Sequence, residues 1–269
     1  SAALGLASTR ASGLKSQFGT MGKPYNAGIA AANALEACGL ARRGFTSAVD
    51  GLGGPQGFVP AHHPQHDSSE AILPDGSETS FMFADVRHKL HACCHGAHAM
   101  IEGLRNLVAA HDITAQNLAA LSIRVNPRWL KVCDIKAPRT GLEVKFSYVF
   151  LAAMVLHHID TAAYQSYDDS ICGNAGLIAT ASKITVIGDE AISDGAVNVS
   201  ADTQTGVRHT TDFDLMDPID LSVLGPRLVA KASVLIGPAR AEKIWESMDD
   251  LDSMPAAQMA RCLQPLQNA

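Results

Sequence analysis

The spacing of the apolar residues changes twice along this chain of 269 residues, and this change limits the folds that the chain can adopt. Apolar residues recur every three or four positions near the front and again from Leu221 onwards, which is typical of amphipathic helices. Between these segments lie four short runs that are typical of strands, at 118–125, 184–187, 196–201 and 207–213. The pattern predicts an α+β protein in which helices at both ends of the chain flank a small mixed sheet.

The same pattern predicts how the chain divides into domains. Residues 1–82 are expected to form part of a mostly helical domain, 83–217 a smaller inserted α+β domain, and 218–269 helices that return to the helical domain. The first boundary follows a stretch at 51–76 that is rich in Gly and Pro, which indicates an irregular connection with short helical turns at most.

One helix is expected over residues 24–43. Pro24 suits the first turn of a helix, and Gly44 suits the position just after its end. Small residues recur on one face, which predicts a close approach to a neighbouring helix: Ala27, Ala30, Ala31, Ala34 and Cys38.

The composition excludes several classes of protein. Lys and Arg total 21 against 27 Asp and Glu, so the chain lacks the basic excess of nucleic-acid-binding proteins. The longest apolar run, 149–156, is much shorter than the ~20 residues that cross a bilayer. The six cysteines contain no C-x-x-C pair, which argues against a structural zinc site. A chain of this size can build a core without disulfides, so adjacent Cys93 and Cys94 are expected to be free thiols. We therefore expect a cytoplasmic protein without a nucleic-acid or membrane partner.

The first candidate functional motif is FGTMGKPYNAG, residues 18–28, in which a glycine-containing loop carries Lys23 to the start of the expected helix. An ammonium group beside the free N–H groups of a helix start can hold an anionic ligand such as a carboxylate or phosphate. The alternative interpretation is a solvated lysine in a turn.

The second candidate motif is KLHACCHGAH, residues 89–98, with three histidines and two cysteines. Its spacing matches no common set of metal ligands, so no metal site is expected. In one interpretation Lys89 stabilises negative charge in a cleft while His91, His95 or His98 moves a proton near neutral pH. In the other, the motif is a polar loop that leads into the helix expected at 97–110.

Three segments occur in the order found in the MmgE/PrpD family, and the chain resembles that family over nearly its whole length. They are FGTMGKPYNAGIAAANALEACGLARRGFT followed by GPQGF, then KLHACCHGAHAMIEGLRNL, then KFSYVFLAAMVL. The family includes 2-methylcitrate dehydratase, cis-aconitate decarboxylase and iminodisuccinate epimerase. The resemblance implies a helical domain with a smaller α+β insertion and an active site in the cleft. It also implies a cytoplasmic homodimer that uses no cofactor and acts on a small polycarboxylate.

The resemblance also implies roles for individual residues. Lys23 and Lys89 correspond to active-site lysines, which are expected to bind substrate carboxylates and to stabilise charge in catalysis. His98 is the expected group for proton transfer, with Cys94 as a second catalytic candidate. Further substrate-binding residues are expected next to these: Tyr25, Asn26 and His95.

The sequence departs from the family at three positions that can carry protons. Asn26 stands where many members have histidine, Cys94 stands where the decarboxylases have histidine, and Phe150 stands where a tyrosine is common. These replacements argue against decarboxylation and indicate a divergent subfamily. A thiolate of Cys94 stabilised by Lys89 or His95 is one interpretation of that residue, and simple packing is the other.

The expected reaction is removal of a proton alpha to a carboxylate, most specifically in a dehydratase of 2-methylcitrate or a related hydroxy acid. An epimerase of an iminodisuccinate-like acid is the alternative, because epimerisation needs no acid for a leaving group. A third hypothesis is an inactive assembly module.

The opening residues SAALGLASTRASGL resemble a helix from the middle of the family's helical domain, so we expect a front portion, with further active-site residues, to be missing.

Overall fold

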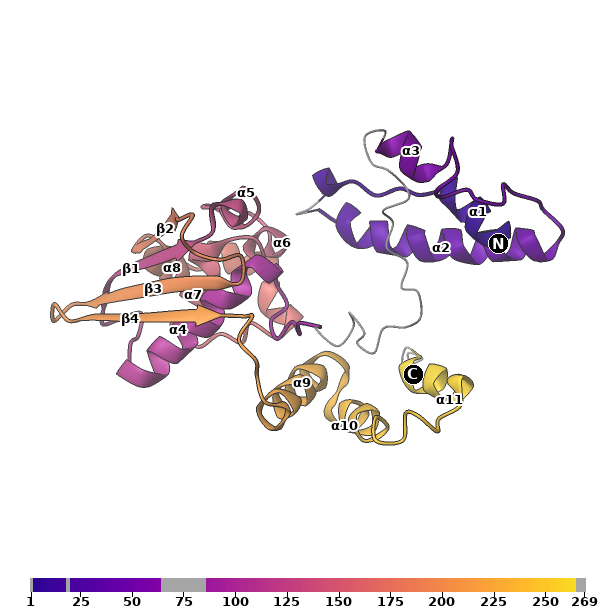
Figure 1. Ribbon diagram of the computed structural model, residues 1–269. Helices are drawn as coiled ribbons and strands as arrows, with labels where there is room; N and C mark the ends of the chain where they lie inside the picture. Colours follow the sequence, from indigo (N-terminus) through magenta and orange to yellow (C-terminus); the bar gives the residue numbers. More distant parts are fainter. Residues whose placement is uncertain (1, 18–19, 64–85, 265–269) are drawn as a thin grey trace. The chain divides into compact units, whose positions relative to one another are not determined.

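The computed structural model describes residues 2–17, 20–63 and 86–264, and Figure 1 shows the course of the chain. Its internal contacts divide the chain into two compact units, Ser1–Val86 and Arg87–Ala269. The first unit is helical in its described part, and the second combines helices with a four-stranded sheet. The fold class is therefore α+β, as the apolar spacing predicts. The predicted boundary after residue 82 lies outside the described residues, and the three predicted domains stay a prediction.

The first unit is built around one long helix, α2 (Gly22–Arg42). The helix expected at 24–43 is thus confirmed with a slightly earlier start, and it ends where Gly44 adopts a φ of +85°. Three shorter elements accompany it: α1 (Ala2–Ser8), the 3-10 turn η1 (Lys15–Gln17) and α3 (Phe58–His62). The short α3 agrees with the irregular connection that its Gly and Pro content predicts.

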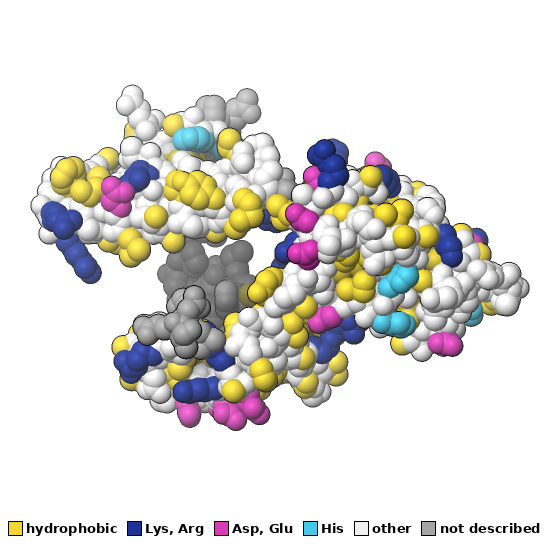
Figure 2. Space-filling model, turned by 180° about the vertical axis from the view of Figure 1, so that it is seen from behind, with side chains coloured by type: hydrophobic (Ala, Val, Ile, Leu, Met, Phe, Trp, Pro, Cys, Tyr) yellow, Lys and Arg dark blue, Asp and Glu magenta, His cyan; other side chains and the backbone are white. Residues whose placement is uncertain are grey.

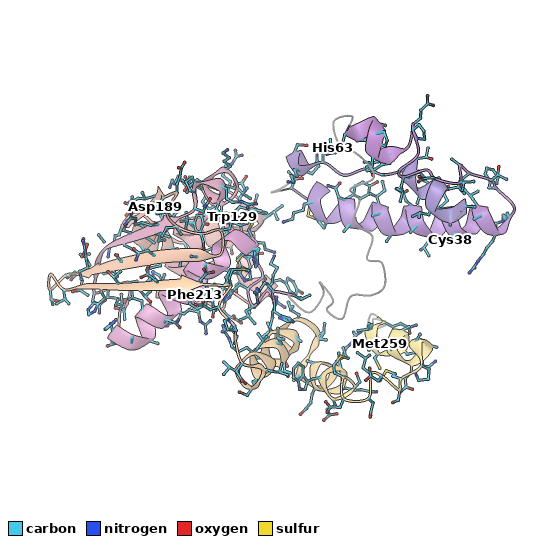
Figure 3. The ribbon with its side chains drawn as sticks, in the orientation of Figure 1. Cys38, His63, Trp129, Asp189, Phe213 and Met259 are labelled. Atoms are coloured by element: carbon cyan, nitrogen blue, oxygen red, sulfur yellow. The ribbon has the colours of Figure 1, made fainter. Side chains whose placement is uncertain are left out.

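The face of α2 that packs inside this unit differs from the predicted one. Asn33 and Ala37 are its buried residues, and the Asn33 amide donates a hydrogen bond to the Arg10 carbonyl just beyond α1 (3.0 Å). The small residues expected to meet another helix, Ala27, Ala30, Ala31, Ala34 and Cys38, are exposed in the described part of this unit. Figure 3 labels Cys38 on this helix, and Figure 2 shows exposed apolar side chains in yellow.

The sheet of the second unit has the strand order β2-β1-β3-β4. Its strands are β1 (Leu118–Val125), β2 (Ile184–Gly188), β3 (Ala196–Thr203) and β4 (Arg208–Asp214). β1 runs parallel to β2 and antiparallel to β3, while β3 and β4 form a hairpin. The mixed sheet and its four predicted strands are confirmed, each end lying within a few residues of the prediction.

Helices cover one face of this sheet (Figure 1). In β3 the buried residues Val197, Val199 and Ala201 alternate with polar ones, as expected when one face meets the core and the other meets water. The covering helices are α4 (His98–His111), α7 (Tyr148–Leu156) and α8 (Ala175–Ala181). Gly103 lets α4 approach β4 closely, since a Cβ there would lie 3.2 Å from the Cβ of Phe213, which Figure 3 labels.

The strongly apolar segment 143–158 does not form one continuous helix. Its first part belongs to the single turn α6 (Gly141–Val144), and α7 then begins anew because the Ser147 hydroxyl caps it by accepting from the Phe150 N–H (3.3 Å). Gly141 lies against the backbone of Tyr167, and a Cβ at 141 would be 1.5 Å from the Tyr167 carbonyl oxygen. Four short elements complete this region: η5 (Pro127–Trp129), α5 (Leu130–Cys133), η6 (Tyr164–Tyr167) and η7 (Asp169–Gly173).

Helices follow the sheet in the rest of the chain, as predicted from Leu221 onwards. They are α9 (Leu221–Ile236), α10 (Pro238–Glu246) and α11 (Ala256–Leu263). Pro238 is the first residue of α10 and Pro255 directly precedes α11, and proline is common at the start of a helix. Within the described ranges, no helix is both long enough and apolar enough to cross a membrane.

Candidate functional site

The segment that leads into α4, residues 89–97, is fixed by contacts with other elements; we call it the site loop. The Ala92 N–H donates to the Thr161 carbonyl (2.8 Å), and the Cys94 N–H donates to the Lys145 carbonyl (3.0 Å). The hydroxyl of Tyr148, at the start of α7, donates to the Gly96 carbonyl (2.8 Å). The loop therefore presents its side chains from a backbone held in one conformation.

Gly96 in the site loop lies against an aromatic ring. A Cβ at this position would be 2.3 Å from Cε3 of Trp129, which is closer than any side chain allows. The Trp129 ring is itself held because its indole N–H donates to the Asp194 carbonyl (2.8 Å). Figure 3 labels Trp129 beside the sheet. Only glycine fits between the loop and this ring without displacing one of them.

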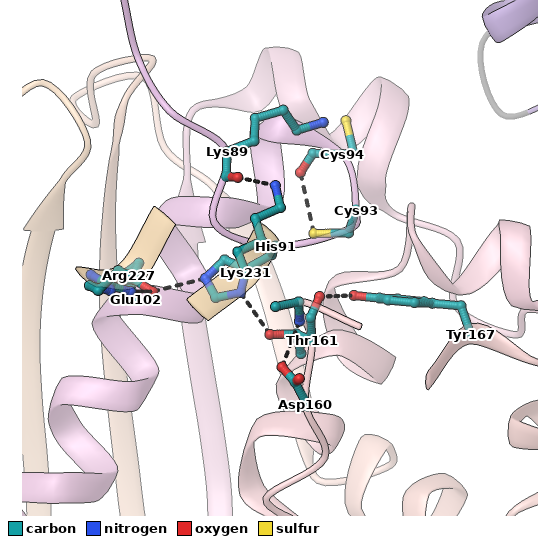
Figure 4. Close-up of polar contacts among 11 residues, drawn as sticks. Lys89, His91, Cys93, Cys94, Glu102, Asp160, Thr161, Tyr167, Arg227 and Lys231 are labelled. Carbon is teal, nitrogen blue, oxygen red and sulfur yellow. Dashed lines mark hydrogen bonds and ion pairs between the residues drawn. The ribbon is translucent and has the colours of Figure 1, made fainter. Parts of the chain in front are cut away.

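His91 lies at the centre of a buried chain of polar contacts (Figure 4). Its Nε2 is 2.8 Å from Oε1 of Glu102, and its Nδ1 is 2.7 Å from the Thr161 hydroxyl. Because an ionised carboxylate only accepts hydrogen bonds, Nε2 carries the proton and the Thr161 hydroxyl donates to Nδ1. Burial lowers the pKa of His91, despite the opposing effect of Glu102. His91 is therefore a neutral imidazole with a fixed tautomer.

Glu102 joins this chain to α9. Both of its carboxylate oxygens are 2.7 Å from Nη2 of Arg227. Burial alone would raise the pKa of Glu102, but the hydrogen bonds of His91 and Arg227 outweigh this effect and lower the pKa to about 2. The carboxylate is thus charged at neutral pH and fixes both His91 and α9.

His98 is the first residue of α4, and its side chain is 1% exposed. Among the described residues its Nε2 has no hydrogen-bond partner. Its ring centroid lies 5.0 Å from that of His91 and 5.5 Å from that of His95. Burial, followed by the charges of His91, Lys89 and other neighbours, lowers the pKa of His98 to about 2. The structure therefore offers a neutral imidazole with an unused ring nitrogen.

Two lysines bring positive charge to this group. The side chain of Lys231, in α9, donates a hydrogen bond to the Lys89 carbonyl, while Lys89 itself is exposed. Burial and the charge of Lys89 lower the pKa of Lys231. Burial and the same charge also lower the pKa of His95. Lys89, His95 and His98 thus lie close together, as the motif at 89–98 suggests, and Lys231 joins them.

The two adjacent cysteines of the loop have different surroundings. The Cys93 thiol is 3.6 Å from the Cys94 carbonyl, and burial raises its pKa to about 12, so it stays protonated. Cys94 is also buried, and in Figure 4 its side chain and that of Lys89 extend to the same side of the loop. The predicted role of Cys94 as an acid or base stays a prediction. Phe150 is buried in α7 among the core residues.

The predicted residues of the first motif lie in the other unit, at the start of α2. Lys23 is in the first turn, where its N–H donates to the Thr20 carbonyl (3.2 Å). Tyr25 is exposed, and the Asn26 amide donates to the Leu14 carbonyl (3.4 Å). The predicted convergence of these residues with Lys89 on one ligand stays a prediction.

Four residues of this arrangement were not predicted from the sequence: Glu102, Thr161, Arg227 and Lys231. A signal for Glu102 exists, because it lies in the helical stripe of Met100, Ile101 and Leu104 and a buried carboxylate needs a partner. No local pattern marks Arg227 as the partner of Glu102, or Lys231 as the partner of the Lys89 carbonyl. Among the described residues, no three His, Cys, Asp or Glu side chains gather as metal ligands.

Comparison with known families gives one match to this part of the chain. Residues 91–215 match the MmgE/PrpD C-terminal domain, a range that runs from His91 to just after β4. It contains the sheet, its covering helices and the histidines of the site loop. No curated protein matches the chain. This match to the C-terminal domain supports membership of the MmgE/PrpD family for the part of the chain that it covers.

Proposed function

We propose that this protein is a cofactor-independent enzyme that removes a proton alpha to a carboxylate of a small polycarboxylate. The observation that carries the proposal is the neutral imidazole of His98, whose Nε2 has no hydrogen-bond partner among the described residues, beside the ammonium groups of Lys89 and Lys231. Membership of the MmgE/PrpD family supports the same class of chemistry. The more specific proposal is a hydro-lyase similar to 2-methylcitrate dehydratase.

The proposed chemistry follows from the charges at the site. Removing the alpha proton places negative charge on the substrate carboxylate, and nearby ammonium groups stabilise this charge in the transition state. His98 is a weak base in this structure because burial and positive charge oppose its protonation. A bound polycarboxylate brings negative charge beside the ring, which raises the pKa of His98 and allows it to accept the proton.

In the dehydratase, the His98 imidazole takes the alpha proton, the C–O bond breaks as the alkene forms, and the resulting imidazolium returns that proton to the leaving hydroxyl, which departs as water. Lys89 holds one carboxylate, while Lys23, in the helical unit, is proposed to hold another. Tyr25, Asn26 and His95 are proposed to contact the remaining polar groups of the substrate. We also propose that the protein is cytoplasmic and forms a homodimer. Sedimentation of the purified chain would test the homodimer.

The alternative proposal is an epimerase of an iminodisuccinate-like dicarboxylate, in which the proton returns to the opposite face of the same carbon. It is favoured by Asn26, Cys94 and Phe150, since these replacements remove groups that could act as acid for a leaving hydroxyl. The third proposal, an inactive assembly module, predicts none of this chemistry.

Proton exchange in heavy water separates these proposals. The chain is incubated with 2-methylcitrate, citrate or iminodisuccinate, with and without an added front portion of the helical domain, and the alpha-proton signal is followed by NMR. Loss of the signal with formation of an alkene indicates the dehydratase, and loss without an alkene indicates the epimerase. No loss in either sample would exclude proton abstraction.

Substitutions then test the residues. Lys89→Gln and His98→Gln are expected to reduce the exchange rate by at least about a hundredfold, because they remove charge stabilisation and the base. Lys23→Ala is expected to weaken substrate binding. Lys136→Gln, which removes a lysine paired with Asp134, is the charge-matched control and should exchange at the rate of the unchanged chain.

A further inference from the structure

A pocket of about 210 Å³ lies in the Arg87–Ala269 unit, between α4 and α9. Arg105 enters it from α4, and Arg227 and Lys231 enter it from α9. The His91 side of the site loop forms another wall, so this pocket lies next to the buried polar contacts of Figure 4. The proposed function shares Lys231 with this pocket, but Lys23, Lys89 and His98 are not among its lining residues.

The cations of this pocket keep hydrogen-bond donors that no described residue uses. Arg227 directs Nη2 to Glu102, and within the described part of the chain its Nε and Nη1 make no further hydrogen bond. Lys231 uses its ammonium group on the Lys89 carbonyl and can donate further bonds. Arg105 is exposed and forms no ion pair with any described residue. The pocket is therefore rich in donors.

Acceptors are few in comparison. Among the described lining residues Asp160 carries the only carboxylate, and its Oδ1 already accepts the Ala162 N–H (2.8 Å). The charge of Glu102 lies behind Arg227 and is shared with His91. Three cationic side chains thus face one carboxylate across a small volume, and an anion would balance the excess charge.

We propose that this pocket binds a small organic acid through a carboxylate, held by Arg105, Lys231 and the unused edge of Arg227. A planar guanidinium matches a carboxylate through two parallel hydrogen bonds, and a lysine beside it adds a point charge. The volume corresponds to several water molecules of about 30 Å³ each, which suits a dicarboxylate of about four carbons. The apolar lining from Leu90, Ala230 and Val234 would cover its carbon chain.

Calorimetric titration of the full chain with succinate tests this inference. Arg105→Gln and Lys231→Gln are each expected to weaken succinate binding at least about tenfold, because each removes a charge-assisted hydrogen bond. Arg124→Gln is the matched control, since Arg124 lies on β1 in an ion pair with Asp189, and it should bind as the unchanged chain does. Thermal melting of each variant shows that it is folded. Arg105→Gln is the more decisive variant because its side chain makes no ion pair inside the described chain.

Other outcomes would overturn the inference. Absence of succinate binding, or unchanged affinity in Arg105→Gln, would exclude the pocket. Weakening by Lys89→Gln but not by Arg105→Gln would place the acid at the proposed active site instead. Inorganic phosphate that binds as tightly as succinate would exclude selectivity for carboxylates. The result is independent of the proposed reaction, because binding that depends on Arg105 would stand even if no alpha proton exchanged.

Discussion

A buried imidazole nitrogen without a hydrogen-bond partner lowers the stability of a folded chain, because the nitrogen loses its bonds to water on folding. Nε2 of His98 is in this state among the described residues. Its neighbour His91 has partners on both ring nitrogens and is explained by structure alone. The two histidines therefore differ in kind: His91 is positioned by the fold, while His98 has a nitrogen available for a ligand.

Replacing His98 by phenylalanine should separate stability from activity. A ring of similar shape fills the same space without a buried polar atom, so the free energy of unfolding should be unchanged or rise by about 1 kcal/mol. Proton exchange should be lost. Denaturant unfolding and the heavy-water assay measure the two effects, with His209→Phe at the edge of the sheet as the control. A large loss of stability together with normal exchange would contradict this assignment.

At the scale of the elements, the conformation of the site loop depends on side chains from several other segments. Tyr148 holds its Gly96 carbonyl, and Lys231 holds its Lys89 carbonyl. The ring of Trp129 covers Gly96 so closely that no side chain fits there. The loop thus needs little reorganisation before it can bind a ligand, which favours catalysis by positioned charges.

Gly96→Ala should destabilise the chain and disturb the loop. The new Cβ would overlap the Trp129 ring, and overpacking of this kind costs about 1–3 kcal/mol. Gly173→Ala is the control, because a Cβ there meets no atom within 4 Å. Urea unfolding of both variants checks the prediction; equal midpoints would show that the ring moves aside without cost.

The elements show what local sequence predicts well. The strand at 118–125 and the helix that begins near His98 follow from apolar periodicity, since each buries one face against the core. Pro238 likewise marks the start of α10. The break between α6 and α7 was not predicted, because continuous burial leaves no periodic signal and the Ser147 cap lies within an apolar run.

In the candidate site, too, residues close together in the sequence could be predicted as a group, whereas contacts between distant residues could not. Lys89, His95 and His98 could be grouped because they lie within ten residues of one another in the sequence. Arg227 could not be paired with Glu102, since the two are 125 residues apart and no local pattern links them. Contacts between residues so far apart in the sequence depend on how α9 packs against α4. The apolar spacing of either helix does not predict this packing.

For the molecule as a whole, buried titratable groups link folding to pH. The pKa of His98 falls from 6.5 to about 2 in the folded chain, and that of Glu102 falls from 4.5 to about 2. In each case the unfolded chain binds a proton at a higher pH than the folded chain does. Both groups therefore stabilise the fold fully only above their unfolded pKa values, and this stabilisation is lost as the pH falls.

The free energy of unfolding should thus decrease below pH 6.5, by about 1.4 kcal/mol per pH unit for the His98 proton, and more steeply below pH 4.5 as Glu102 contributes. Glu102→Gln should remove the steeper part and cost roughly 3 kcal/mol at neutral pH, because it leaves Arg227 without its carboxylate. Denaturant unfolding across this pH range measures both. A flat profile from pH 6.5 to 4.5 would contradict the burial of a neutral His98.

The close approach of Gly141 to the Tyr167 backbone affects the position of His91, although Gly141 does not contact that histidine. Any side chain at 141 would push the Tyr167 backbone away. The Tyr167 hydroxyl donates to the Thr161 carbonyl, and the Thr161 hydroxyl in turn donates to Nδ1 of His91. A random mutagenesis screen for lost activity would therefore recover changes at Gly141 together with changes at the histidines, although this glycine meets no ligand.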